Sequence, residues 1–139
     1  LHHSSLSNCV LGMLACQSGY YDEAYEYFAQ SARMDLDDYH DNFYAGIHAA
    51  NMAGTWQAII NGFAGVRVNG GGLELHPYVP EKWNGMQFYL LYRGRKLKIQ
   101  LTHEKTRVEL AAGDAVTLKL NEKEIHLEPG EGSVYEEEI

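Results

Sequence analysis

The hydrophobic pattern of this 139-residue chain changes its period near residue 65, and this change limits the fold more than any other feature. Before residue 65, apolar side chains recur every three or four residues, as on one face of an α-helix. After it they alternate with polar ones, as on a β-strand with one buried face. We therefore expect an α+β protein with two units, residues 1–65 and residues 66–139.

The first unit contains three segments with helical spacing. The first spans residues 6–17, the second follows Asp22 as its N-cap, and the third runs from about His48 to Gly62. The side chains expected to face a core are Leu6, Cys9, Val10, Met13, Leu14 and Gln17; Ala24, Tyr25, Phe28, Ala29 and Ala32; and Ala49, Met52, Ala53, Trp56, Ile59, Ile60 and Phe63. Three helices alone bury little apolar surface, so we interpret them as the end of a larger helical domain.

The second unit contains short segments with alternating apolar residues. Residues 66–68 and 73–75 flank a run of glycines, which predicts a hairpin. Further strands are expected around residues 86–92, 97–101, 108–110, 116–120 and 125–127. One apolar face on each of these short strands predicts a small antiparallel β-sandwich. The acidic run at residues 136–138 is expected to be a frayed end.

The charge distribution limits the partners of the chain. Its formal net charge is −8, and residues 1–65 contain seven acidic residues and one basic residue. Nucleic acids and anionic membranes require a basic patch, so neither is an expected partner. No apolar run approaches the roughly 20 residues that span a bilayer.

The two cysteines, Cys9 and Cys16, lie seven residues apart in the first helical segment. On a helix they would share one face at a separation of roughly 10 Å, which is too far for a disulfide. Their spacing is not that of a zinc site, and we expect no metal. Two unpaired, core-facing thiols fit a cytoplasmic location.

Polar residues at the starts of the first and third helical segments are the candidates for chemistry. His2, Ser4 and Ser5 precede the first segment, and His48 begins the third. Short connections make successive helices antiparallel, so both N-termini should lie at one end of the unit. Helix N-termini, hydroxyl groups and an imidazole together favour an anion such as phosphate.

Simpler interpretations of the same residues remain open. Ser4 and Ser5 can serve only as helix caps, and His48 can be a buried, hydrogen-bonded imidazole. The acidic run at residues 35–38 is interpreted as a solvated loop, in preference to an acid–base pair.

Several short motifs, taken together in order, resemble glycoside hydrolase family 65. They are His2-x-Ser4-Ser5-Leu6-Ser7, residues 24–28, 31–33, 35–39, Gly46-Ile47-His48, residues 52–56, 62–68 and 77–80, Trp83 and residues 92–95. The resemblance implies that residues 1–65 complete an (α/α)6 barrel that is followed by a C-terminal β-sandwich. It also implies inverting phosphorolysis of an α-linked glucose disaccharide, with inorganic phosphate as co-substrate and no cofactor.

The same resemblance assigns roles to individual residues. Ser4, Ser5 and His48 would belong to the phosphate site, with His2 close by. The general-acid Glu of the family has no counterpart here and is expected in a preceding part of the same polypeptide, so this segment alone would be inactive. Members are often dimeric, which makes a homodimer a further expectation. Tyr44-Ala45 stands where the family often has an acidic residue, so the disaccharide stays open.

Two other functions remain open at this stage. A hydrolase of the same family, similar to a trehalase, would use an activated water and a carboxylate base in place of phosphate. A structural or sugar-binding module without catalysis is the alternative from another class.

Overall fold

The computed structural model describes residues 4–38, 44 and 46–139, and the chain separates into two units, Leu1–Phe63 and Ala64–Ile139. Within these described residues the helices all lie in the first unit and the strands all lie in the second, as the change in hydrophobic period predicts. The expected α+β class is thereby confirmed.

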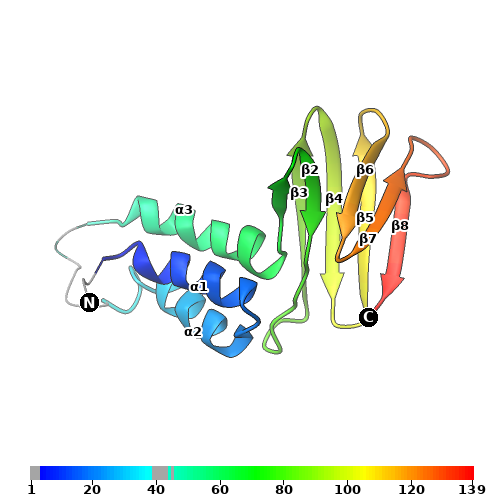
Figure 1. Ribbon diagram of the computed structural model, residues 1–139. Coiled ribbons are helices and arrows are strands. Elements are labelled where there is room, and N and C mark those ends of the chain that lie inside the picture. Colours follow the sequence, from blue (N-terminus) through cyan, green and yellow to red (C-terminus); the bar gives the residue numbers. More distant parts are fainter. Residues whose placement is uncertain (1–3, 39–43, 45) are drawn as a thin grey trace. The chain divides into compact units, whose positions relative to one another are not determined.

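The first unit is a layer of three helices that run alternately in opposite directions (Figure 1). The helices are α1 (Ser7–Gln17), α2 (Tyr21–Ala32) and α3 (Ala49–Gln57), and α3 continues into a π-helical segment, η2 (Ala58–Phe63). α1 and α3 are therefore parallel, and their N-termini lie at the same end of the unit, as expected, although residues 33–48 form a long connection between α2 and α3.

The two cysteines of α1 face two glycines of the third helical segment. A Cβ atom on Gly54 would overlap the Sγ atom of Cys9, and one on Gly62 would lie 3.3 Å from the Sγ of Cys16. Both cysteines are buried, and they form no disulfide with each other. Cys9 and Cys16 are seven residues apart, whereas Gly54 and Gly62 are eight residues apart. A π-helical turn contains more residues than an α-helical turn, so η2 accommodates the additional residue.

The prediction of inward-facing side chains is correct for Cys9, Ala24 and Phe63, which are buried, but it is wrong for several other large apolar residues. Val10 and Leu14 of α1 are 47% and 51% exposed, and Met52 and Trp56 of α3 are 53% and 56% exposed. The residues of α3 that are buried are instead small or polar, namely Asn51 and Gly54. Small residues let α1 and α3 approach closely, so the large apolar side chains form stripes on the outer surface of the unit.

A buried polar cluster joins α2 to α3. The hydroxyl of Ser31 donates to Oδ1 of Asn51 at 2.7 Å and lies 2.7 Å from the hydroxyl of Thr55. Nδ2 of Asn51 donates to the backbone carbonyl of Ser31, also at 2.7 Å. Because these groups satisfy one another, two polar side chains can lie in a packed interface without leaving unpaired atoms.

The second unit is a sandwich of two four-stranded sheets (Figure 1). One sheet has the order β1 (Arg67–Asn69), β2 (Gly72–Leu75), β6 (Val116–Leu120) and β7 (Lys123–Leu127), and the other has the order β3 (Gly85–Tyr92), β4 (Arg95–Thr102), β5 (Lys105–Ala112) and β8 (Val134–Glu138). The expected hairpin is confirmed by the antiparallel pairing of β1 with β2. Alternate residues of the strands are buried, among them Leu73, Leu118, Ile125, Leu97, Ile99 and Val108.

Two details of the predicted sandwich are wrong. β2 pairs with β6 in parallel, so the sandwich is not purely antiparallel. Between β2 and β6 the chain forms β3, β4 and β5 of the other sheet. β6 then lies beside β2 and runs in the same direction. The acidic tail is not frayed either, because β8 pairs with β5 and Glu136 accepts a 2.8 Å ion-pair hydrogen bond from Arg107. Its acidic residues form an exposed edge strand, which has little hydrophobic alternation to reveal it.

None of the helices in the described residues is both long enough and apolar enough to cross a bilayer.

Candidate anion-binding site

The N-terminus of α1 lacks a side-chain cap. Its N-cap residue is Leu6, which forms no side-chain capping hydrogen bond. Ser4 forms a local turn instead: its carbonyl accepts the N–H of Ser7 at 3.0 Å, and its hydroxyl oxygen accepts the N–H of Leu6 at 3.4 Å. Ser4 is exposed and Ser5 half-buried. The two serines precede the helix and leave N–H groups of its first turn available to an anion.

The N-terminus of α3 begins at His48, which contacts one carboxylate through two groups. The backbone N–H of His48 donates to Oδ2 of Asp35 at 3.1 Å, and its ring Nδ1 lies 2.5 Å from Oδ1 of the same side chain. The side chains of His48 and Asp35 are 18% and 23% exposed. The hydrogen bond from His48 lowers the pKa of Asp35, although partial desolvation acts in the opposite direction.

Asp35 is the residue of this site that the sequence pattern missed. The expectation of a solvated loop holds for its neighbour Asp37, which is exposed and forms an ion pair with Arg33 at 2.5 Å. Asp35 differs because it contacts a histidine 13 residues further along the chain. A separation of 13 residues between two different elements follows no helical or strand period, so no periodic spacing could have revealed the contact.

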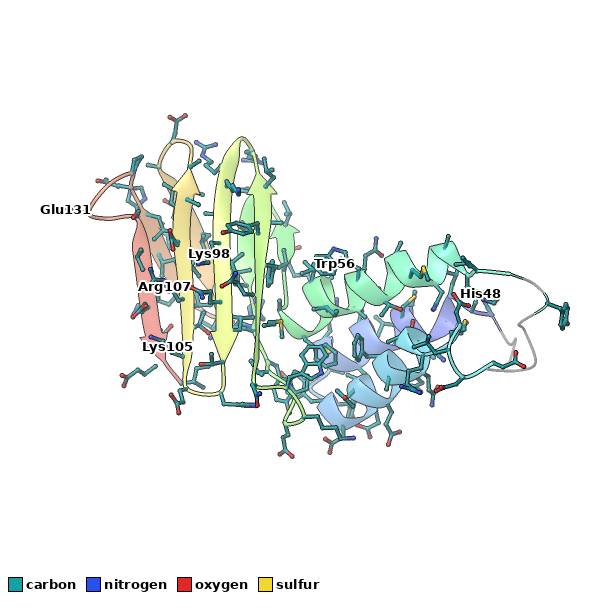
Figure 2. The ribbon with its side chains drawn as sticks, turned by 180° about the vertical axis from the view of Figure 1, so that it is seen from behind. His48, Trp56, Lys98, Lys105, Arg107 and Glu131 are labelled. Carbon is teal, nitrogen blue, oxygen red and sulfur yellow. The ribbon has the colours of Figure 1, made fainter. Side chains whose placement is uncertain are left out.

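The structure brings some of the predicted site residues together and not others. The starts of α1 and α3 lie at the same end of the helical unit (Figure 1). Ser4 and Ser5 directly precede α1 in the sequence, and His48, labelled in Figure 2, is the N-cap of α3. Among the hydrogen bonds of the described residues, none joins either serine to His48. His2 lies outside the described residues. The alternative interpretation of His48 as a partly buried, hydrogen-bonded imidazole is also satisfied by its contact with Asp35.

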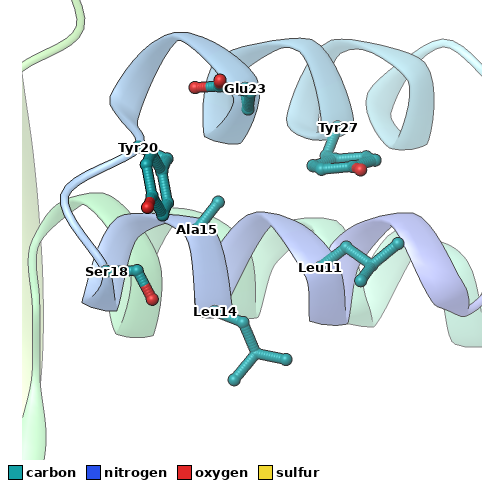
Figure 3. Close-up of a pocket in the computed structure, with 7 residues that line it drawn as sticks. All are labelled: Leu11, Leu14, Ala15, Ser18, Tyr20, Glu23 and Tyr27. Atoms are coloured by element: carbon teal, nitrogen blue, oxygen red, sulfur yellow. The ribbon is translucent and has the colours of Figure 1, made fainter.

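A pocket of about 350 Å³ lies elsewhere, between α1 and α2 (Figure 3). It is open to solvent and lined by Leu11, Leu14, Ala15, Ser18, Tyr20, Glu23 and Tyr27. Its single carboxylate, Glu23, has no second acidic group beside it in this lining, and the remaining surface is mostly apolar. The described residues also contain no group of three or more His, Cys, Asp or Glu side chains arranged to hold a metal ion.

Comparison with known proteins finds two family models that follow each other along the chain. The model described as "Glycosyl hydrolase family 65 central catalytic domain" matches residues 1–57, and the model described as "Glycosyl hydrolase family 65, C-terminal domain" matches residues 66–127. Together they account for most of both structural units. The chain therefore belongs to glycosyl hydrolase family 65.

Similar proteins in this family have been characterised or solved. The chain is 48% identical over 130 residues to an α,α-trehalose phosphorylase of Thermoanaerobacter brockii, which covers 94% of the chain and 17% of that protein. It is 35% identical over 119 residues to a kojibiose phosphorylase of Halothermothrix orenii, covering 86% of the chain and 15% of the relative. A solved structure from the human microbiome, provisionally named a kojibiose phosphorylase, matches all of the chain and 20% of its own length, with a TM-score of 0.89 and 27% identity. The chain thus spans about one sixth of the length of these curated relatives.

Proposed function

We propose that this chain is part of a longer disaccharide phosphorylase, in which its helical unit completes an (α/α)6 barrel and supplies the phosphate side of the active site. The substrate would be an α-linked glucose disaccharide. Phosphate would attack the anomeric carbon as the glycosidic C–O bond breaks, and a Glu from a preceding part of the polypeptide would protonate the departing oxygen. Inversion at that carbon gives β-glucose 1-phosphate. The names of the relatives, trehalose phosphorylase and kojibiose phosphorylase, support the reaction class.

The observation that carries this proposal is the common position of two uncapped helix N-termini. α1 and α3 both present first-turn N–H groups at the same end of the unit, and neither N-cap residue forms a side-chain capping bond. The hydroxyl of Ser4 accepts a backbone bond, so its own proton remains available to donate. Nδ1 of His48 contacts Asp35, which leaves Nε2 as the ring nitrogen that donates to an anion when both ring nitrogens carry protons. Together these are the donors that a phosphate requires.

The exposed apolar stripes support the proposal that further helices cover this unit. Val10 and Leu14 are four residues apart on α1, and Met52 and Trp56 are four apart on α3, so each pair forms one exposed stripe. Large exposed apolar side chains at helical spacing indicate a surface that packs against another element. The neighbouring helices of a barrel in the same polypeptide would supply that element.

A hydrolase is the second candidate, because the matched family models are described as glycosyl hydrolase domains. In a hydrolase, water activated by a carboxylate would replace phosphate. Ser4, Ser5 and His48 would then have only capping and packing roles.

The test uses the longer polypeptide to which we assign this chain. It is incubated with trehalose, kojibiose or maltose, with and without phosphate, and the products are separated and their anomers assigned by NMR. We expect phosphate-dependent release of β-glucose 1-phosphate from one of the three sugars. Free glucose released at the same rate without phosphate would overturn the proposal in favour of the hydrolase.

A further inference from the structure

We infer that Asp35 is a positioning residue for phosphorolysis: its carboxylate accepts from Nδ1–H and fixes the orientation of His48, so that the protonated ring presents Nε2–H to the attacking phosphate. This inference rests on the proposed function, because it assumes that His48 contacts phosphate. It assigns a role to a residue of the acidic loop for which sequence patterning indicated only solvation.

The geometry that carries the inference is the double contact between one carboxylate and one residue. Oδ2 of Asp35 accepts the backbone N–H of His48, and Oδ1 lies 2.5 Å from the ring Nδ1. An ionised carboxylate only accepts hydrogen bonds, so Nδ1 must carry a proton. Nε2 is the nitrogen left for another partner, and it donates to a phosphate oxygen when it carries a proton as well, in the imidazolium form. Because both ends of the carboxylate are engaged, the ring is fixed relative to its own backbone at the first turn of α3.

The position of Asp35 is otherwise unfavourable for an anion site. A carboxylate at the N-terminus of α3 is a second negative charge near the proposed phosphate, and like charges at short range repel each other. Two roles for Asp35 therefore predict opposite results. If Asp35 acts only through its charge, removing that charge strengthens phosphate binding. If Asp35 positions His48, removing it weakens phosphate binding.

Asp37 provides a matched control. It lies two residues further along the same loop, is 41% exposed, and pairs with Arg33 rather than with His48. Asp35→Asn and Asp37→Asn remove the same charge from the same loop. Only the first changes the group that accepts the two hydrogen bonds of His48.

The experiment measures the steady-state kinetics of the longer enzyme with phosphate and disaccharide varied separately. For Asp35→Asn we expect the KM for phosphate to rise about tenfold, a typical loss for one charge-assisted hydrogen bond, with the KM for the disaccharide unchanged. Asp37→Asn should leave both values within about twofold, because surface ion pairs contribute little. An unchanged or lower KM for phosphate in Asp35→Asn overturns the inference.

Repeating the Asp35→Asn substitution in a His48→Ala variant separates a failure of this inference from a failure of the proposed function. In His48→Ala, where the ring is absent, Asp35→Asn should have no further effect on the KM for phosphate if Asp35 acts through that ring. If His48→Ala itself leaves the phosphate KM unchanged, the proposed phosphate site is wrong. If His48→Ala raises it and Asp35→Asn does not, only the positioning role is wrong.

A conservative variant covers the case in which Asp35→Asn does not fold. Asp35→Glu keeps a carboxylate on a longer side chain and can still accept from the imidazole. We expect its KM for phosphate to lie between those of the wild type and His48→Ala. A KM for phosphate equal to that of His48→Ala, with the helical circular dichroism intact, would also support the positioning role, because it would show that the carboxylate must lie at one position. A KM for phosphate equal to that of the wild type would contradict the positioning role.

Discussion

Replacing Gly54 by alanine should destabilise the helical unit, because α1 and α3 approach each other most closely at this residue. A Cβ atom on Gly54 would overlap the Sγ of Cys9 and lie 3.1 Å from its Cβ. Both residues are buried, and Cys9 is only 3% exposed. Alanine gains about 0.5–1 kcal/mol from helix propensity, but an additional methyl group in a packed interface costs about 1–3 kcal/mol. We expect a net loss of about 1–2 kcal/mol.

A double-mutant cycle with Cys9→Ala identifies the cause of that loss. Removing the sulfur should by itself cost about 1 kcal/mol, because it leaves a small cavity. In the double variant the methyl group of residue 54 occupies the space that the sulfur vacates. We therefore expect the pair to be more stable than the sum of the single changes by about 1–2 kcal/mol, and more stable than Gly54→Ala alone.

The assay is urea unfolding followed by the helical circular dichroism signal, since all the described helices lie in the first unit. Ala53→Gly at the exposed neighbouring position measures the propensity contribution separately. Two results would refute the close contact between α1 and α3. One is a Gly54→Ala variant as stable as the wild type, and the other is a change in unfolding free energy of the double variant that equals the sum of the changes in the single variants.

Three further changes test other parts of the structure. Asn51→Leu removes two buried hydrogen bonds to Ser31 and should lower the free energy of unfolding by about 2–3 kcal/mol in urea; an unchanged value would contradict the buried cluster. Gly65→Ala should cost at least about 2 kcal/mol, measured as a lower Tm, because residue 65 has a φ of +61° and its Cβ would lie 2.7 Å from the backbone nitrogen of His76. The pKa of Asp35 is below its ordinary 3.8 because of the hydrogen bond from the imidazole that it contacts, so its stabilising effect is present above pH 3.8 and is lost as the pH falls through the lowered value. Acid titration of the helical signal should therefore show a smaller acid-induced loss of stability in Asp35→Asn than in the wild type.

Hydrophobic period alone predicts much of the fold. The change from a helical to an alternating pattern near residue 65 places the helices and strands correctly, and the hairpin of β1 and β2 follows from glycines that can adopt positive φ. The parallel pairing of β2 with β6 and the edge strand β8 could not be predicted. Sheet order depends on long-range pairing, and an exposed edge strand has little hydrophobic alternation.

The orientation of the helices shows where pattern reasoning fails. An apolar stripe indicates a face that becomes buried, but not the partner against which it is buried. Met52 and Trp56 form such a stripe and are exposed in this chain, whereas Gly54 on the same helix forms the close contact with α1. For the candidate site, helix direction predicts the shared end of α1 and α3. The contact between Asp35 and His48 joins residues 13 apart in the sequence, and no helical or strand period predicts such a pair.

The most direct test of the account is a phosphate titration of the longer enzyme with single substitutions at the starts of α1 and α3. Ser5→Ala and His48→Ala are compared with Ser18→Ala, a matched serine substitution at the C-cap of α1. The account predicts that the first two variants raise the KM for phosphate by about tenfold each, as expected for one lost hydrogen bond to an anion, while Ser18→Ala behaves as the wild type. A KM for phosphate that equals the wild-type value in all three variants would contradict a phosphate site at these helix N-termini.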